Sequence, residues 1–138
     1  MILGIPKEIL DNETRVAVIP ATVKQFVAAG FAVKVESGAG VKSEISDAQY
    51  KDAGAEVVAI ASNVYSGSDM ILKVNSPTAE EIPMIKDGSS YISFFQTMRE
   101  TEKVRALQNK NVTGYSMHLI PRTTLAQKMD ALSSQTNI

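Results

Sequence analysis

Short apolar segments alternate with amphipathic segments along this chain, and this alternation limits its fold more than any other feature of the sequence. The apolar segments are the expected strands, at 2–5, 32–35, 56–58, 70–74, 91–95 and 112–117. The expected helices between them lie at 20–29, 46–54, 78–85 and 101–109. Strands separated by helices imply right-handed crossovers and a parallel sheet. The sequence therefore predicts a doubly wound α/β domain of the Rossmann or flavodoxin type, with helices flanking a parallel sheet.

Local signals support several of these boundaries. Gly30 follows the helix expected at 20–29 and is a typical stop signal. Ser46 and Gln49 form a capping box, in which each side chain can satisfy a free backbone N–H at the start of a helix. The segment 91–95 is apolar with little alternation, which is typical of a strand covered on both faces.

Length and composition exclude several classes of function. The chain has 138 residues, the size of one domain, and it contains no cysteine, which excludes disulfide scaffolds, thiolate zinc sites and cysteine nucleophiles. The formal net charge is -1 and the basic residues are scattered, so no nucleic-acid partner is expected. No apolar run approaches the length of a membrane span, and the N-terminus lacks the basic region of a secretory signal. We expect a cytoplasmic protein that can still dock on a membrane partner.

One glycine-rich turn, Gly38-Ala39-Gly40, follows an expected strand. It begins like a dinucleotide-binding fingerprint, but position 43 is serine and the next helix begins only near Ser46. A tight turn with positive φ at glycine is therefore favoured over a phosphate site. His118, the only histidine, follows the last expected strand, where ligands bind in open α/β sheets. A lone histidine without a partner is more often a loop residue than a catalytic one.

Two cations lie near strand ends. Arg15 follows the first expected strand, and Lys73 lies at the end of the fourth. Together they can clamp a carboxylate or a phosphate. Salt bridges with Glu8, Glu13 or Asp69 are the simpler interpretation, and spacing alone favours it. No pair of histidines and carboxylates has metal-ligand spacing, so no metal is expected.

Polar side chains gather after the last expected strand, at Arg122, Gln127, Asp130 and Ser133. Arg122 offers a planar fork of donors, and Gln127 offers both a donor and an acceptor. Asp130 and Ser133 can cap a helix that begins near the end of the chain. A solvated loop with a helix cap explains these residues equally well. A helix of so few residues has almost no hydrogen bonds, so the sequence is interpreted as interrupted there.

Several segments together resemble one protein family. They are Gly4-Ile5-Pro6-Lys7-Glu8, Glu13-Thr14-Arg15-Val16-Ala17 with Pro20, Val35-Glu36-Ser37-Gly38-Ala39-Gly40, Ala53-Gly54-Ala55 and Ile71-Leu72-Lys73-Val74. In this order they are similar to the signature shared by alanine dehydrogenases and the NAD(H)-binding subunits of proton-pumping nicotinamide nucleotide transhydrogenases. The resemblance covers essentially the whole chain and is far more specific than any single motif.

Two segments distinguish the branches of this family. In alanine dehydrogenases the segment after the fifth strand carries a catalytic histidine, whereas this chain has Gln96 in the segment 93–97 and no histidine there. The tail 121–135 is similar to the Arg–Gln–Asp loop of transhydrogenases. The resemblance implies that the catalytic residues are the three of this loop, Arg122, Gln127 and Asp130. It implies that the same three residues bind the cofactor, together with Ser133, which matches a serine that contacts the nicotinamide end.

The resemblance implies a transhydrogenase activity, in which hydride moves between NADH and NADP+ and the transfer is coupled to proton translocation. Such a transfer changes no heteroatom protonation, so it needs aligned rings more than an acid or a base. The expected cofactors are NAD(H) in the full protein and NADP(H) on a partner component. The expected partners are that component, a membrane proton channel and a second copy of the chain, at the cytoplasmic face of the membrane.

The resemblance also implies a domain organisation. Residues 1–138 form the single N-terminal α/β domain, and the NAD-binding Rossmann domain that should follow is absent, so the chain alone is expected to be inactive. Two alternatives stay open. One is the substrate half of an alanine dehydrogenase-like enzyme, which binds a small amino or keto acid through Arg15 and Lys73. The other is a non-catalytic binding module.

Overall fold

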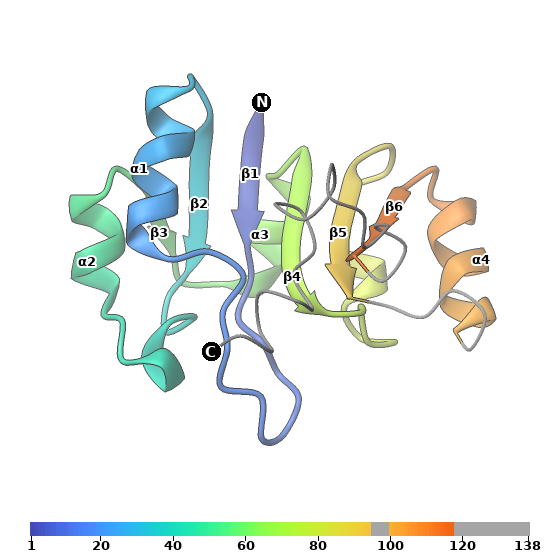
Figure 1. Cartoon of the computed structure of the whole chain (residues 1–138). Coiled ribbons are helices and arrows are strands. Elements are labelled where there is room, and N and C mark those ends of the chain that lie inside the picture. The colour runs from blue at the N-terminus through green and yellow to red at the C-terminus, as the bar shows by residue number, and fades with distance from the viewer. Residues whose placement is uncertain (95–99, 118–138) are drawn as a thin grey trace, which may run out of the picture.

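The computed structural model describes residues 1–94 and 100–117, and these form one α/β sheet domain (Figure 1). The strands described are β1 (Ile2–Ile5), β2 (Ala32–Glu36), β3 (Glu56–Val58), β4 (Met70–Asn75), β5 (Ser90–Phe94) and β6 (Thr113–Ser116). The helices are α1 (Pro20–Ala28), α2 (Asp47–Asp52), α3 (Ala61–Ser66) and α4 (Thr101–Asn109), with short 3-10 helices η1 (Val41–Ser43) and η2 (Ile82–Met84).

The sheet is parallel throughout the described residues. Its strand order is β3-β2-β1-β4-β5-β6, and every neighbouring pair is parallel. The first strand therefore lies in the middle, with β2 on one side and β4 on the other. The prediction of a doubly wound parallel sheet is confirmed. This order places a topological switch point between β1 and β4, where ligands bind at the carboxyl ends of the strands in such folds.

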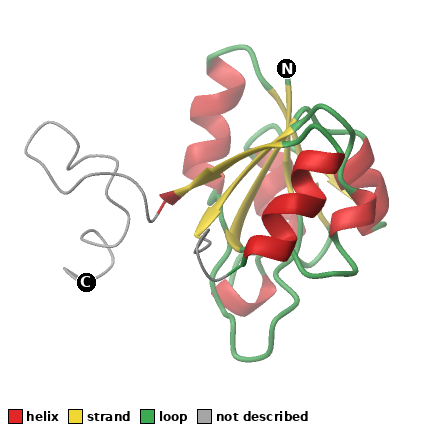
Figure 2. Ribbon diagram, turned by 90° about the vertical axis from the view of Figure 1, so that its right-hand side faces the viewer, coloured by secondary structure: helices red, strands yellow, loops and turns green. Residues whose placement is uncertain are grey.

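Two apolar clusters cover the two faces of the sheet, and helices lie on both sides of it (Figure 2). One cluster packs α1 and α2 over β1 to β3 through buried residues that include Ile5, Val23 and Tyr50. The other packs α3, η2 and α4 over the opposite face and includes Ile71 and Tyr91. β1, in the middle of the sheet, is buried at three successive residues, as a strand covered on both faces should be, whereas burial alternates along β5, which was expected to be covered on both faces.

Local sequence signals explain several of these boundaries. Pro20 is the first residue of α1, where a missing N–H costs nothing, and Gly30 follows the helix with φ of 95°. α2 begins with the expected capping box. The Ser46 hydroxyl accepts from the Gln49 N–H at 3.2 Å, and the Gln49 side-chain oxygen accepts from the Ser46 N–H at 2.8 Å.

Two expectations about helices are wrong. The segment 78–85 is not one short helix, because only η2 is helical there. Pro83 lies inside this segment and lacks the N–H that an α-helix needs. The sequence also predicted no helix between β3 and β4, where α3 forms. Its N-cap, Ile60, supplies no side-chain hydrogen bond, so the start of α3 carries no capping signal.

The half of the sheet formed by β4, β5 and β6 is covered unequally. η2 and α4 pack over one face. On the other face none of the described helices lies over these strands (Figure 2), and Leu72, Ile92 and Phe94 are only partly buried. No helix among the described residues has both the length and the apolar character needed to cross a membrane.

Candidate functional site

The candidate site lies at the carboxyl ends of β1 and β4, where the direction of strand winding reverses. Glu8 follows β1, and Lys73 lies in β4. Both side chains are nearly inaccessible, with relative exposures of 3% for Glu8 and 1% for Lys73. Burying charged groups is costly unless they are paired and hydrogen-bonded, so their partners define the site.

Lys73 is held by two buried carboxylates. Its Nζ lies 3.3 Å from Glu8 Oε1 and 3.0 Å from Glu81 Oε2. The Tyr65 hydroxyl also donates to Glu81 Oε2, at 2.7 Å. Burial, with the nearby Tyr91 and Glu81 as smaller causes, raises the pKa of Tyr65 far above its usual value, so the phenol stays a donor. Lys73 is therefore committed to internal ion pairs.

Glu8 also binds the backbone of β4. The pairing of β4 with β5 shifts register between Leu72 and Asn75, which marks a β-bulge or a similar irregularity. The Val74 N–H donates to Glu8 Oε2 at 2.9 Å, and the Asn75 N–H donates to Glu8 Oε1 at 3.2 Å. The carboxylate therefore satisfies two successive backbone donors at the switch point.

Asn75 connects this buried cluster to Arg15. Its Nδ2 donates to Glu8 Oε1 at 3.1 Å and to Glu13 Oε2 at 2.9 Å. Glu13 in turn accepts from Arg15 Nε at 2.8 Å and from Arg15 Nη2 at 2.9 Å. The Arg15 hydrogen bonds, helped by Asn75 against the opposing effect of burial, lower the pKa of Glu13 to about 2. The same pair raises the pKa of Arg15.

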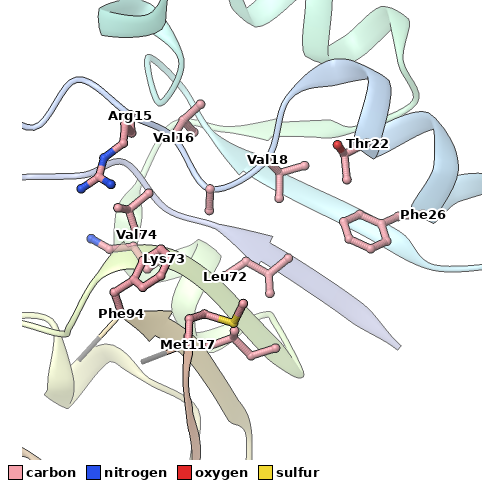
Figure 3. A pocket seen from close by; sticks show the side chains of 12 residues that line it. Arg15, Val16, Val18, Thr22, Phe26, Leu72, Lys73, Val74, Phe94 and Met117 are labelled. Atoms are coloured by element: carbon pink, nitrogen blue, oxygen red, sulfur yellow. The ribbon is translucent and has the colours of Figure 1, made fainter. Parts of the chain in front are cut away.

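A pocket of about 450 Å³ opens beside this network (Figure 3). Arg15 and Lys73 lie at the same end of it, and the remaining walls are mostly apolar. The lining residues come from the β1–α1 loop, α1, β4, β5 and the end of β6: Arg15, Val16, Ala17, Val18, Thr22, Phe26, Leu72, Lys73, Val74, Ile92, Phe94 and Met117. The pocket can hold an apolar group whose polar end lies near the exposed Arg15, while the Lys73 Nζ is turned to Glu8 and Glu81 and is 1% exposed.

The ion pairs expected for the two cations form in part. Lys73 pairs with Glu8, and Arg15 pairs with Glu13, as the simpler interpretation predicted. Asp69 pairs with neither cation. It instead lies 2.9 Å from Lys86 Nζ and accepts from the Ile2 N–H. The structure therefore brings Arg15 and Lys73 to one pocket, with both charges already compensated.

The turn at Gly38 is filled by a carboxylate of the protein itself. Gly38 has φ of 82°, which favours glycine. Its N–H donates to Asp47 Oδ1 at 2.9 Å, and the Ser37 hydroxyl donates to Asp47 Oδ2 at 2.6 Å. These bonds, that from Gly38 first, lower the pKa of Asp47. The tight-turn interpretation is confirmed, because the donors that a phosphate would need are bonded to Asp47.

The other residues expected at the site lie outside the described residues. They are Gln96, His118, Arg122, Gln127, Asp130 and Ser133. Sequence reasoning missed Asn75 and Glu81. A signal for Glu81 was present, because a lysine inside the apolar run 70–74 needs a buried carboxylate. Within residues 1–94 and 100–117, no group of histidines and carboxylates is arranged to hold a metal ion.

The sequence and the fold of this chain are similar to those of known proteins. The profile of the family described as "Alanine dehydrogenase/PNT, N-terminal domain" matches residues 4–138. NAD(P) transhydrogenase subunit alpha from Haemophilus influenzae is 41% identical over 138 residues, which is 100% of this chain and 27% of that protein. An alanine dehydrogenase from Methanococcus maripaludis is 40% identical over 120 residues, which is 87% of this chain and 32% of that protein.

A solved structure agrees with these sequence matches. The crystal structure of transhydrogenase from Sinorhizobium meliloti superposes with a TM-score of 0.94 at 40% identity, over 99% of this chain and 39% of that one. This chain therefore spans between about a quarter and two-fifths of the length of the relatives it matches.

Proposed function

Because this chain belongs to the alanine dehydrogenase/PNT N-terminal domain family, we propose that it is part of the NAD(H)-binding component of a transhydrogenase. The complete protein moves hydride between NADH and NADP+ and couples this transfer to proton translocation. In this proposal the chain supplies the loop that orients the nicotinamide end of NAD(H), and the remainder of a longer protein supplies the site for the rest of the cofactor.

One observation carries the proposal. The similarity to a transhydrogenase alpha subunit extends over 100% of the chain, so it includes the segment with Arg122, Gln127 and Asp130. The similarity to the alanine dehydrogenase covers 87% of the chain. The residue at the expected position of the dehydrogenase histidine is Gln96, which cannot serve as an acid or a base.

The chemistry of the described site supports the same assignment. Oxidative deamination needs a group that accepts or donates a proton, and hydride transfer between two nicotinamide rings does not. Glu8, Glu13 and Glu81 all accept bonds from cations or N–H donors inside the protein. Such carboxylates stabilise geometry and are poorly arranged for proton exchange with a substrate.

The roles proposed for the loop follow from side-chain chemistry and from the family resemblance. Arg122 presents a planar fork of donors to the carboxamide end of the ring. Gln127 reaches ribose hydroxyls with its donor and its acceptor. Asp130 and Ser133 hold the loop and the start of the following helix.

The described residues do not fit the pyrophosphate of NAD(H). The turn at Gly38 is bonded to Asp47, and the donors at the switch point are bonded to Glu8. We therefore assign the phosphates to a separate Rossmann domain of the longer protein. The partners in this proposal are an NADP(H)-binding component, a membrane proton channel and a second copy of the chain, at the cytoplasmic face of the membrane.

One observation favours a second candidate, the substrate half of an amino-acid dehydrogenase. Arg15 and Lys73 line the same end of one pocket, and two cations can bind the carboxylate of a small amino or keto acid. Their pairing with Glu13, Glu8 and Glu81 weakens this candidate, because a substrate carboxylate would have to compete with internal carboxylates, and those of Glu8 and Glu81 are buried.

A chimeric protein tests the proposal directly. This chain replaces the matched region of the Haemophilus influenzae transhydrogenase alpha subunit, and the product is assembled with the other components of that enzyme. We expect NADH-dependent reduction of NADP+ and no reduction of NAD+ by alanine. A second chimera, in which this chain replaces the matched region of the Methanococcus maripaludis alanine dehydrogenase, is expected to be inactive. Alanine oxidation by either chimera would favour the second candidate.

The isolated chain is expected to bind NADH weakly or not at all. The turn at Gly38 and the backbone donors of β4 are bonded to Asp47 and Glu8, so they offer no phosphate site. Titration followed by NADH fluorescence or by calorimetry measures this, and the transhydrogenase chimera is the positive control. Micromolar binding by the isolated chain would show that the main cofactor site lies within these 138 residues.

A further inference from the structure

Four donors at the carboxyl end of β4 converge on one carboxylate. They are the backbone N–H groups of Val74 and Asn75, the Asn75 Nδ2 and the Lys73 Nζ, at 2.9 to 3.3 Å from Glu8 oxygens. All four donors come from three successive residues of the chain. Their acceptor, Glu8, comes from a segment more than sixty positions earlier. The arrangement is therefore a receptor built by one segment and filled by another.

The composition of this receptor matches a carboxylate. Successive backbone N–H groups form concave anion sites, and an ammonium group strengthens each hydrogen bond to an anion. The pairs between β1 and β4 are Leu3 with Met70 and Gly4 with Ile71, and beyond them the Glu8 side chain accepts from β4 in place of the β1 backbone. Glu8 as a whole residue is 4% exposed, so its carboxylate is held away from water.

The charges around the Glu8 carboxylate determine what remains when this carboxylate is removed. Lys73 pairs with both Glu8 and Glu81. Without the Glu8 carboxylate, Lys73 and Glu81 form a neutral pair, and the donors of Val74 and Asn75 lose their acceptor. Buried donors without an acceptor are costly, which favours the uptake of another acceptor. A monovalent carboxylate would restore both the charge of the native cluster and the two oxygens that accept from these donors, which a spherical anion such as chloride does not supply.

We propose that residues 73–75 form a binding site for a small monocarboxylate, and that Glu8 is its built-in ligand. The native chain is closed to free carboxylates at this site, because Glu8 occupies it. Shortening the side chain opens the site to the free acid whose size equals that of the deleted atoms. This inference does not depend on the proposed function.

Size matching gives the test its specificity. Glu8→Ala removes the atoms of one acetate ion, and Glu8→Gly removes those of one propionate ion. We expect acetate to raise the urea midpoint of Glu8→Ala saturably, and propionate to do so for Glu8→Gly. Each variant should bind its matched acid about fourfold more tightly than the acid that differs by one methylene. Amide NMR shifts of Val74 and Asn75 should follow the same saturation curve.

Three controls separate this site from general salt effects. Sodium chloride at equal concentration should leave the midpoints of both variants unchanged relative to wild type. Glu8→Gln keeps the volume of the side chain, so it should respond to neither acid. Asp47→Ala frees an N–H and a hydroxyl in an exposed turn, where water replaces the carboxylate, so it should also give no saturable response.

Several results would overturn the proposal. One is an equal response of wild type or Asp47→Ala to the acids, and another is the absence of any size preference. A third is that the amide NMR signals of Val74 and Asn75 do not shift when the acids are added. If Glu8→Ala and Glu8→Gly are unfolded in buffer, the matched acids should restore the native spectrum. Failure of both acids to restore either variant would count against the site.

Discussion

Gln127→Asn is expected to slow hydride transfer by about a hundredfold in the assembled transhydrogenase chimera, with little change in NADH affinity. The substitution keeps the amide chemistry and removes one methylene of reach. Misplacement of about 1 Å in a site that works by positioning can cost roughly a hundredfold in rate. Stopped-flow measurement of NADP+ reduction gives the transfer rate, and fluorescence titration gives the affinity.

Gln108→Asn is the matched control for this prediction. Gln108 is exposed on α4, and the same change there should alter neither rate nor affinity. A transfer rate for Gln127→Asn equal to that of the control would remove the positioning role assigned to this residue. A parallel loss of rate and affinity would instead assign Gln127 to ground-state binding of NADH.

Lys73→Met is expected to lower the free energy of unfolding of the chain by about 3–5 kcal/mol. Methionine fills a similar volume, but it leaves the carboxylates of Glu8 and Glu81 buried without their shared cation. The free energy of unfolding of a typical domain is only about 5–15 kcal/mol, so this loss is a large share of the stability. Urea unfolding followed by circular dichroism measures the change.

An exposed ion pair of similar length provides the control. Lys86 Nζ lies 2.9 Å from Asp69 Oδ1, but the two side chains are 48% and 38% exposed. Lys86→Met should therefore cost at most about 1 kcal/mol, because water screens such a pair. Adding Glu8→Gln and Glu81→Gln to Lys73→Met should recover part of the loss. Equal midpoints for the two lysine variants would show that the buried cluster contributes no more than the exposed pair.

The fold could be predicted from the sequence where the apolar periodicity of a segment agrees with the signals at its ends. α1 and α2 carry apolar periodicity with a proline, a capping box or a glycine at their ends, and Pro6 follows β1, whereas α4 is predicted from its apolar periodicity alone. Periodicity fails where an element is short and its stability comes from tertiary packing. α3 has six residues and no capping side chain, yet Val64 and Tyr65 are buried in it.

The candidate site could be predicted only in part, because its bonds join distant segments. Arg15 and Lys73 stand out as cations near strand ends, but only the observed pairing of β1 with β4 shows that they meet at one pocket. The roles of Asn75 and Glu81 depend on contacts between β4, the β1–α1 loop and the segment before η2. Nothing in the local pattern around Asn75 indicates that its side chain bonds two glutamates.

The central place of β1 has a consequence for synthesis of the chain on the ribosome. The buried members of the cluster under α1 and α2 all lie between Ile5 and Ala55, so this half can pack before β4 has emerged from the ribosome. Until then, the edge of β1 that later pairs with β4 has no partner strand. Met70 follows Val58 by 12 positions, which corresponds to roughly one second of translation. During that interval the nascent half-sheet presents an open strand edge, the kind of surface on which chains pair wrongly with one another.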